Sequence, residues 1–509
     1  MLPFLAEVQN ASKKYSVAFK GLNYGEGTLD GEFAETYNLS TDQYPCITQR
    51  AARVMHGEYT SPTTLHSKGK LLVIDGTDVI YGGTKVGKVT AGKKQTATIG
   101  NYIVIFPDKK YYKVPTEDDK DGEFGSMEET YTATGLVFTN STITTTGADF
   151  KFREGDAVTI TGCSNNANNK EPIIRSVSGK VLTFGENEFA EGTESGSVTL
   201  KRSVPDLDFI CESNYRLWGT HGNTIYSSKF SDPLNFKVFD NLASDSYAIE
   251  VGSEGEFTGC IPYSSHICFF KENTLHKVYG TKPSNFQVTT ANVYGVQSGS
   301  ERSMQIVNEQ LLYKGVGGVY AYTGGVPELI SEKLGNNRYS DAVACCDGEK
   351  YYISMKQGDT WSLFTYDVLK NIWLREDDTH AVDMSFYDGK IFFIDEAGRL
   401  YCIDKSIKTV TSDWSATFCT MHETMNERKG YSKFHLRMDL AAEAWLAVDI
   451  KTDNDLQWRQ IYTTHNEKAK TISIPILPTR CDSIDIRLRG RGRCTIKTFI
   501  REFTVGSDV

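Results

Sequence analysis

The sequence Ile391-Phe392-Phe393-Ile394, followed after a polar turn by Leu400-Tyr401-Cys402-Ile403-Asp404, is the repeating unit that decides the fold. Both runs are short, apolar and rich in aromatic or β-branched residues, which favours strands over helices. The turn that joins them contains Asp395 and Gly398, residues that hairpin turns use. The unit therefore predicts two strands joined as a hairpin.

Six other copies of this unit lie between residue 65 and residue 391. They pair 71–76 with 79–81, 102–106 with 111–114, 216–219 with 224–226, 267–271 with 275–279, 311–313 with 318–322, and 351–354 with 363–367. From the third copy on, the first strands start near residues 216, 267, 311, 351 and 391, so their spacing is 51, 44, 40 and 40 residues. A period of about 40–50 residues with several strands per repeat is typical of β-propeller blades. We predict an all-β protein with a propeller of about seven blades.

The repeats leave three further segments to explain. An interruption at 123–203 follows the acidic loop 117–121 and contains short strand-like runs, which predicts an inserted small β-barrel or sandwich. Alternating stretches after residue 412 predict a C-terminal β-sandwich. The expected domains are an extended N-terminal arm (1–60), the two parts of the propeller (61–122 and 204–411), the insert (123–203) and the sandwich (412–509). The arm is expected to supply the strand that closes the last blade to the first, or to reach a neighbour.

Composition narrows the class of protein. The 44 glycines suit many tight turns, and an aromatic content of 12% suits a large core. A net charge of −10 argues against a general nucleic-acid coat, which would be basic. The 11 cysteines form no CxxC pair, so we expect free thiols packed in the core. We find no signal-peptide pattern and no apolar window of membrane-spanning length, so we expect synthesis in the host cytoplasm and no membrane span.

Several stretches partly match catalytic or binding motifs. Residues 82–89 match a phosphate loop up to Lys88, but Val89 stands where a Ser or Thr must bind Mg²⁺, so a Gly/Lys-rich hairpin is favoured. Residues 354–361 are similar to the Asp-box of sialidase propellers, but Lys356 replaces the defining aspartate. A blade turn with a buried Trp361 is favoured there.

The acidic and histidine residues give no stronger signal. Asp449, Asp453 and Asp455 have partial calcium-loop spacing without the turn glycine, so a solvated sheet edge is favoured. The pairs Asp206/Asp208 and Asp377/Asp378 could form a glycosidase pair, but neither lies in an aromatic-flanked motif. The nine histidines lack metal-site spacing. We therefore expect no enzyme, no cofactor and no metal.

One charged stretch stands out near the C-terminus. Arg487, Arg489, Arg491 and Arg493 alternate along a predicted strand, and residues two apart share a face of a strand. Such a row suits phosphate or a carboxylate-rich surface, and in an acidic protein the simplest partner is another copy. These four arginines are the candidate subunit or partner contact. A solvated hairpin is the alternative interpretation.

The third repeat carries a family resemblance. The segments 204–209 (VPDLDF), 214–219 (NYRLWG) and 224–236 (TIYSSKFSDPLNF), with 269–272 (FFKE), 278–280 (VYG) and 501–503 (REF), are similar to the tail hub or nozzle proteins of tailed bacteriophages, also called phage stabilisation proteins. The resemblance is best over about 60–410.

That resemblance implies a virion structural protein of the phage tail. It implies a homo-oligomeric ring, typically a hexamer, below the portal and adaptor, with tail fibre or needle proteins as further partners. The ring forms a channel that retains packaged DNA, lets it pass during ejection and supports tail assembly. An acidic channel wall would let DNA slide, because phosphate contacts with Lys or Arg are what hold DNA. The alternative is a glycan-binding or glycan-cleaving propeller that acts as a receptor-binding tail protein.

Overall fold

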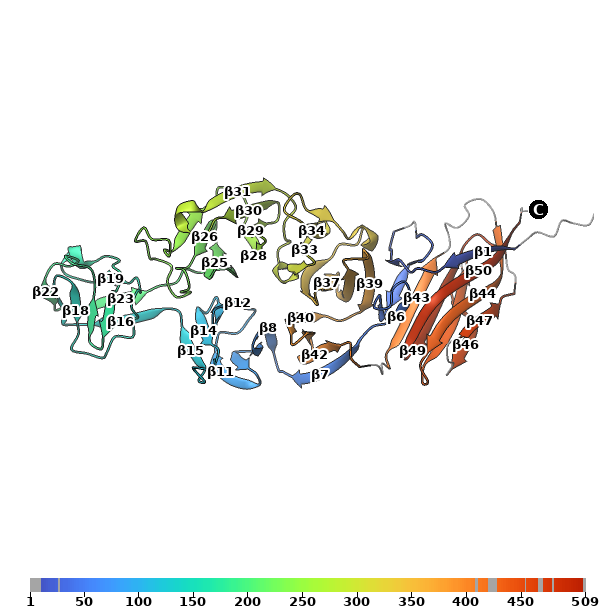
Figure 1. The fold of residues 1–509 in the computed structure, drawn as a ribbon, viewed down its shortest axis with the longest axis horizontal. Coiled ribbons are helices and arrows are strands. Elements are labelled where there is room, and N and C mark those ends of the chain that lie inside the picture. The colour runs from blue at the N-terminus through green and yellow to red at the C-terminus, as the bar shows by residue number, and fades with distance from the viewer. Residues whose placement is uncertain are drawn as a thin grey trace, which may run out of the picture. The chain divides into compact units, whose positions relative to one another are not determined.

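The computed structural model describes residues 11–25, 28–407, 411–419, 428–453, 455–465, 470–477 and 480–506. These residues form strands and short 3₁₀ helices but no α-helix. They divide into two compact units, residues 60–301 and residues 1–59 with 302–509. Each unit is coloured by residue number in Figure 1.

The unit 60–301 contains four propeller blades, each a four-stranded antiparallel sheet. Consecutive strands pair as hairpins within every blade, which confirms the predicted strand pairs. The strands are β8 (Pro62–Lys68), β9 (Lys70–Asp75), β10 (Asp78–Tyr81) and β11 (Thr84–Lys88); β12 (Gln95–Ile99), β13 (Tyr102–Phe106), β14 (Lys110–Lys113) and β15 (Glu123–Ser126); β24 (Phe209–Ser213), β25 (Arg216–His221), β26 (Thr224–Ser227) and β27 (Tyr247–Glu250); β28 (Phe257–Tyr263), β29 (His266–Lys271), β30 (Thr274–Tyr279) and β31 (Gln287–Asn292) after the 3₁₀ helix η2 (Pro283–Asn285).

The other unit holds three more blades, so the count of seven is confirmed. Their strands are β32 (Gln305–Val307), β33 (Gln310–Gly315), β34 (Gly318–Tyr322) and β35 (Glu328–Leu329); β36 (Ser340–Cys346), β37 (Lys350–Gln357), β38 (Thr360–Asp367) and β39 (Ile372–Asp377); β40 (Ala381–Tyr387), β41 (Lys390–Asp395), β42 (Arg399–Asp404) and β7 (Ala52–Glu58). The 3₁₀ helices η3 (Glu301–Ser303) and η4 (Glu332–Leu334) flank the first of these blades. Strand β7 comes from the N-terminal segment and pairs with β42. The N-terminal segment thus supplies the fourth strand of the last blade.

The C-terminal sandwich consists of two sheets. One has the order β47 (Lys470–Pro475), β44 (Arg428–Leu440), β50 (Cys494–Gly506), β6 (Ile47–Gln49) and β5 (Leu39–Ser40), with β1 (Ser12–Ser16) beside β50 and β48 (Arg480–Cys481) beside β44. The other has the order β4 (Glu35–Tyr37), β43 (Asp413–Cys419), β49 (Ile484–Arg491), β45 (Trp445–Thr452) and β46 (Arg459–His465). A short parallel pair, β2 (Gly21–Leu22) with β3 (Glu32–Phe33), lies between β1 and β4 in the chain.

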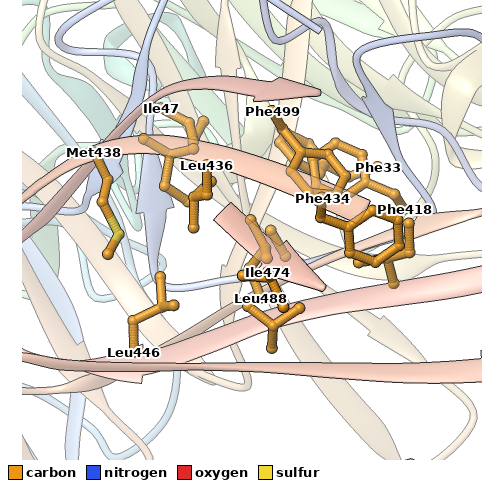
Figure 2. Close-up of a cluster of buried hydrophobic side chains, with 14 of the residues drawn as sticks. Phe33, Ile47, Phe418, Phe434, Leu436, Met438, Leu446, Ile474, Leu488 and Phe499 are labelled. Carbon is orange, nitrogen blue, oxygen red and sulfur yellow. The ribbon is translucent and has the colours of Figure 1, made fainter. Parts of the chain in front are cut away.

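The N-terminal segment is therefore part of the sandwich, not only an extended arm. Its strands β1, β4, β5 and β6 complete both sheets, and its side chains Phe33 and Ile47 are buried in the shared core. Figure 2 shows these two residues among the side chains of that core. The strands within residues 31–49 are only two or three residues long, so their sequence does not indicate a sandwich edge. Their stability comes from packing in the core that contains Phe418, Phe434 and Phe499.

The insert is a small β domain of two sheets around its own core. The first sheet is β16 (Glu129–Ala133), β23 (Val198–Arg202) and β19 (Thr159–Thr161). The second is β20 (Ser176–Ser178), β21 (Val181–Thr183), β18 (Thr142–Thr144), β17 (Leu136–Phe138) and β22 (Gly192–Glu194), and η1 (Asn166–Asn168) lies in an Asn-rich turn. The expected start at residue 123 is wrong, because residues 123–126 pair with β14 as the fourth strand of the second blade.

Strand β33 buries a lysine whose charge opposes folding. Lys314 is 1% exposed, and burial lowers the pKa of its amine to about 8. Its Nζ donates to the carbonyl of Gly315. The unfolded chain binds this proton more tightly than the folded chain, so the free energy of unfolding should rise as the pH rises from about 8 to about 10.5.

Replacing Lys314 with Met should remove this pH dependence. We expect Lys314→Met to stabilise the protein at pH 7 by up to about 3 kcal/mol, because lowering the pKa of the Lys314 amine from 10.5 to about 8 costs roughly that energy. The gain should shrink toward pH 10.5. Urea unfolding at pH 7 and near pH 10 measures both values, with the exposed Lys282→Met as the control. An equal difference from wild type at both pH values would contradict the prediction.

Candidate functional site

The predicted row of arginines lies on the outer face of the second sheet of the sandwich. Strand β49 pairs with β43 on one side and β45 on the other. Its residues Ile484, Ile486 and Leu488 enter the core, so the alternating Arg487, Arg489 and Arg491 face outward. Gly490 lies between them on the core side, where an added Cβ would fall 2.6 Å from Trp414 Cζ2. A side chain at 490 would therefore push the sheet away from its core.

Arg493 does not continue the row. Strand β49 ends at Arg491, and Gly492 turns the chain with a φ of +84° that favours glycine. Arg493 lines a separate pocket with residues of the N-terminal segment, among them Asp42 and Gln49. The outward face predicted for four arginines thus holds for three of them.

A buried carboxylate organises two of these arginines. Asp449 lies on the neighbouring strand β45 and is 1% exposed. Its Oδ2 accepts from Arg487 Nη2 at 2.8 Å and from Arg489 Nε at 2.6 Å. Burial raises the pKa of Asp449, but the hydrogen bonds and charges of Arg489 and Arg487 outweigh it, so the pKa lies below the usual value. The expectation that Asp449 lies on a solvated sheet edge is wrong.

Two tryptophans complete this surface, which we call the arginine face (Arg487, Arg489, Arg491, Trp445 and Trp458). The guanidinium carbon of Arg487 lies 4.3 Å from the centre of the Trp458 ring, and that of Arg489 lies 5.6 Å from the Trp445 ring. Stacking and the Asp449 carboxylate fix the two guanidinium groups in place. Arg491 is the most exposed, with 61% of its side chain accessible, and its Nε donates to the Thr411 carbonyl at 2.7 Å.

A polar cleft lies elsewhere in the same unit, between the last two blades. It has a volume of about 450 Å³ and is bounded by the end of β39, the turn between β41 and β42, β7 and β4. We call it the β39 cleft. Its lining includes Tyr37, Arg53, Asp378, Glu396 and Arg399. Two of its acids, Asp377 and Asp378, are the pair considered above as a possible glycosidase pair.

A buried ion-pair network forms the floor of this cleft. Arg53 Nη2 lies 2.9 Å from Glu376 Oε2, and Arg53 Nη1 lies 2.6 Å from Asp377 Oδ2. Burial raises the pKa of Glu376. Burial also acts on Asp377, but there the charge of Arg53 and the hydrogen bonds from Thr379 outweigh it and lower the pKa. Asp377 is thus held as a carboxylate that serves Arg53, and Asp378 pairs with Arg375.

Trp361 contacts the lining of the β39 cleft through His380 and does not lie in a buried blade core. It is half-buried, not buried as expected, and its ring stacks on His380 with centres 3.7 Å apart. His380 Nδ1 lies 3.2 Å from Glu396 Oε2. Residues 354–361 form the hairpin from β37 to β38, so the blade turn predicted there is confirmed.

The other sequence motifs have structural roles. Residues 82–89 form the hairpin between β10 and β11, as favoured. Asp206 pairs with Lys109 at 2.9 Å and Asp208 with His221 at 3.1 Å, so each of these acids contacts a basic residue.

All 11 cysteines are free thiols, and eight of them are buried. Within the described ranges, no group of three or more His, Cys, Asp or Glu residues could hold a metal ion, and no helix is long and apolar enough to cross a membrane.

The motif of the third repeat joins the blade to the insert. Arg216 is buried, and its guanidinium donates to the carbonyls of Ser228, Ala243 and Asp245 at 2.5–2.8 Å. It thereby shapes the loop that contains Asn235. Asn235 Nδ2 donates to Asp156 Oδ1 of the insert at 2.9 Å. Sequence inspection missed this role, because Asp156 lies 79 residues before its partner.

Asp156 is the centre of this junction. It is 1% exposed, and its Oδ2 accepts from Arg202 Nη1 at 2.6 Å and from the Arg153 backbone N–H at 2.8 Å. Arg202 is also buried and donates through Nε to the Met127 carbonyl. The insert is therefore joined to its blade by the hydrogen bond from Asn235 to Asp156, and the buried charge pair of Asp156 with Arg202, which lies within the insert, holds that carboxylate in place.

Known proteins offer a likeness of fold only. No family model and no curated protein matches the chain. Among solved structures, BamB from Moraxella catarrhalis is 9% identical and covers 71% of this chain and 98% of its own, with a TM-score of 0.35. A protein from Lactobacillus plantarum is 10% identical, with coverages of 72% and 92% and a TM-score of 0.29. An exo-β-1,3-galactanase from Phanerochaete chrysosporium is 8% identical, with coverages of 56% and 92% and a TM-score of 0.21.

The chain is thus an all-β protein: a seven-bladed β-propeller with an inserted β domain and a C-terminal sandwich. The TM-scores lie below 0.5, so none of these likenesses bears on activity, ligands or partners.

Proposed function

We propose that the chain is a non-catalytic structural protein of a phage tail that assembles with copies of itself into a ring. The motifs of the third repeat, which are similar to those of tail hub and nozzle proteins, are the observation that carries the proposal. In that role the ring would lie below the portal and adaptor, meet fibre or needle proteins and let DNA pass. A hexamer is the order that the resemblance implies.

The arginine face is the surface we assign to the contact between copies. Three cations point outward from a rigid central strand, on a chain of net charge −10. Rigid guanidinium groups lose little entropy on pairing with carboxylates. An acidic surface of a neighbouring copy has the complementary charge. Contacts between two different surfaces of one chain form a ring when the rotation between successive copies closes.

The direct test is the oligomeric state of the purified protein. Mass photometry and negative-stain electron microscopy should show rings, either from the protein alone or after addition of a portal–adaptor complex. Monomers under both conditions would overturn the proposal. An uncharged or acidic ring channel seen in such particles would further support a role in DNA passage, because phosphate binding depends on Lys and Arg.

Removing cations from the arginine face should weaken assembly. We expect Arg489→Ala/Arg491→Ala to raise the dissociation constant of the ring contact roughly tenfold, because each exposed ion pair contributes up to about 1 kcal/mol. Added salt should weaken wild-type assembly more than that of the variant, since salt screens exposed pairs. Sedimentation velocity over a salt series measures both effects.

Two further variants separate assembly from folding. Arg491→Glu leaves the Asp449 network intact and reverses one charge, so it should assemble at least as weakly as the double variant. Arg338→Ala/Lys282→Ala removes two exposed cations elsewhere and should assemble like wild type. If Arg491→Glu assembled like wild type, the alternative interpretation would hold: these arginines would be a solvated surface and not a subunit contact.

A further inference from the structure

The walls of the β39 cleft are held in place before any ligand arrives. Asp395 Oδ1 accepts from the backbone N–H groups of Ala397 and Arg399 at 3.1 and 2.9 Å, which fixes the turn between β41 and β42. Asp377 Oδ1 accepts from the Thr379 N–H at 3.0 Å on the opposite wall. A volume of about 450 Å³ lies within the range of about 300–1,000 Å³ that small-molecule sites occupy.

The arginines of the cleft are paired with its own carboxylates. Three arginines line it (Arg50, Arg53 and Arg399), together with four carboxylates (Asp377, Asp378, Asp395 and Glu396). Arg53 meets Asp377 and Arg399 meets Asp395 at 2.6–2.9 Å, so these cations are already paired. A charged ligand would have to compete with these internal pairs and lose its own hydration. The cleft therefore favours an uncharged ligand.

The exposed polar groups of the cleft still offer both acceptors and donors. The side chains of Asp378 and Glu396 are 67% and 72% accessible, and that of Arg399 is 46% accessible. A hydroxyl group can donate to a carboxylate and accept from a guanidinium at once. The half-buried rings of Tyr37 and Tyr401 add apolar surface to the same lining. A molecule dense in hydroxyls with apolar faces fits all of these features.

We propose that the β39 cleft binds an uncharged oligosaccharide. Asp378, Glu396 and Arg399 hold its hydroxyl groups, and the aromatic rings pack against its C–H faces. This inference does not depend on ring assembly, since every residue of the cleft belongs to one compact unit of one chain.

Saturation-transfer NMR with the full chain tests the proposal. The probes are maltose, cellobiose, lactose and N,N′-diacetylchitobiose, with glucuronic acid and glucosamine as charged comparators. At least one uncharged disaccharide should bind, and more tightly than either charged sugar. No binding of any uncharged probe, or tighter binding of a charged sugar, would overturn the proposal.

Variants place the binding in the cleft. Asp378→Asn/Glu396→Gln should weaken binding of the best probe at least tenfold, because it removes the acceptor strength of both exposed carboxylates. Asp359→Asn/Glu332→Gln changes two exposed acids outside the cleft and should bind like wild type. Thermal unfolding of both variants checks that the fold is intact. Equal binding by the two double variants would show that the sugar binds elsewhere and the proposal is wrong.

Discussion

Replacing Arg53 with Ala is expected to lower the free energy of unfolding by about 3–5 kcal/mol, the usual cost of removing one partner of a buried ion pair. The guanidinium of Arg53 holds two carboxylates, Glu376 and Asp377, and its Nη1 also donates to Thr379 Oγ1 at 2.6 Å. Without Arg53, both carboxylates stay buried with too little compensating charge. The loss should destabilise the pairing of β7 with β42, because β7 carries Arg53 and completes the last blade.

Urea unfolding followed by tryptophan fluorescence measures this loss, since Trp361 and Trp373 lie in the neighbouring blade. Arg399→Ala is the matched control: it removes an arginine of the same cleft whose pair with Asp395 is exposed, so it should cost less than about 1 kcal/mol. A second variant, Arg53→Met/Glu376→Gln, removes part of the unpaired charge and should recover some of the lost stability. A cost for Arg53→Ala as small as that for Arg399→Ala would contradict the prediction.

The blades could be predicted from sequence because their hairpins are local. In the pair 391–394 with 400–404, the strands, the turn and the apolar pattern lie within a few residues of one another, and β41 and β42 form where expected. The same holds for the strands Trp445–Ile450 and Ile484–Leu488 of the sandwich, which alternate between core and outer face. Alternation also placed Arg487, Arg489 and Arg491 on one face.

Contacts that join distant segments left no such signal. Arg53 and Glu376 lie 323 residues apart, and neither has a neighbour in sequence that indicates a buried pair. The strands β4, β5 and β6 are two or three residues long, so their place in the sandwich depends on packing rather than on pattern. Asp449 was misread for the same reason: its acidic neighbours Asp453 and Asp455 suggested an exposed edge, whereas two arginines from β49 allow it to be buried.

Replacing Asp156 with Ala is the second change expected to have a large effect. Arg202 would keep its charge in a site where it is 3% exposed, and Asn235 would lose an acceptor. We expect the free energy of opening the insert to fall by about 3–5 kcal/mol, because Asp156 forms a buried pair with Arg202 within the insert and also binds Asn235 of the blade. Because this is opening of one part of a large chain, native-state hydrogen exchange is a better measure than global unfolding.

Amides of β19 and β23 should exchange roughly a hundredfold faster or more in Asp156→Ala, at about 1.4 kcal/mol per factor of ten. Asn235→Ala removes hydrogen bonds but no buried charge, so its effect should be intermediate, about 1–3 kcal/mol. Arg175→Ala breaks the exposed pair with Asp240, which joins the same two parts at 3.2 Å, and should change exchange little. The order Asp156, Asn235, Arg175 is the decisive result. If Arg175→Ala opened the insert as much as Asp156→Ala, the exposed pair of Arg175 with Asp240 would matter as much as the buried contacts of Asp156, and the prediction would be wrong.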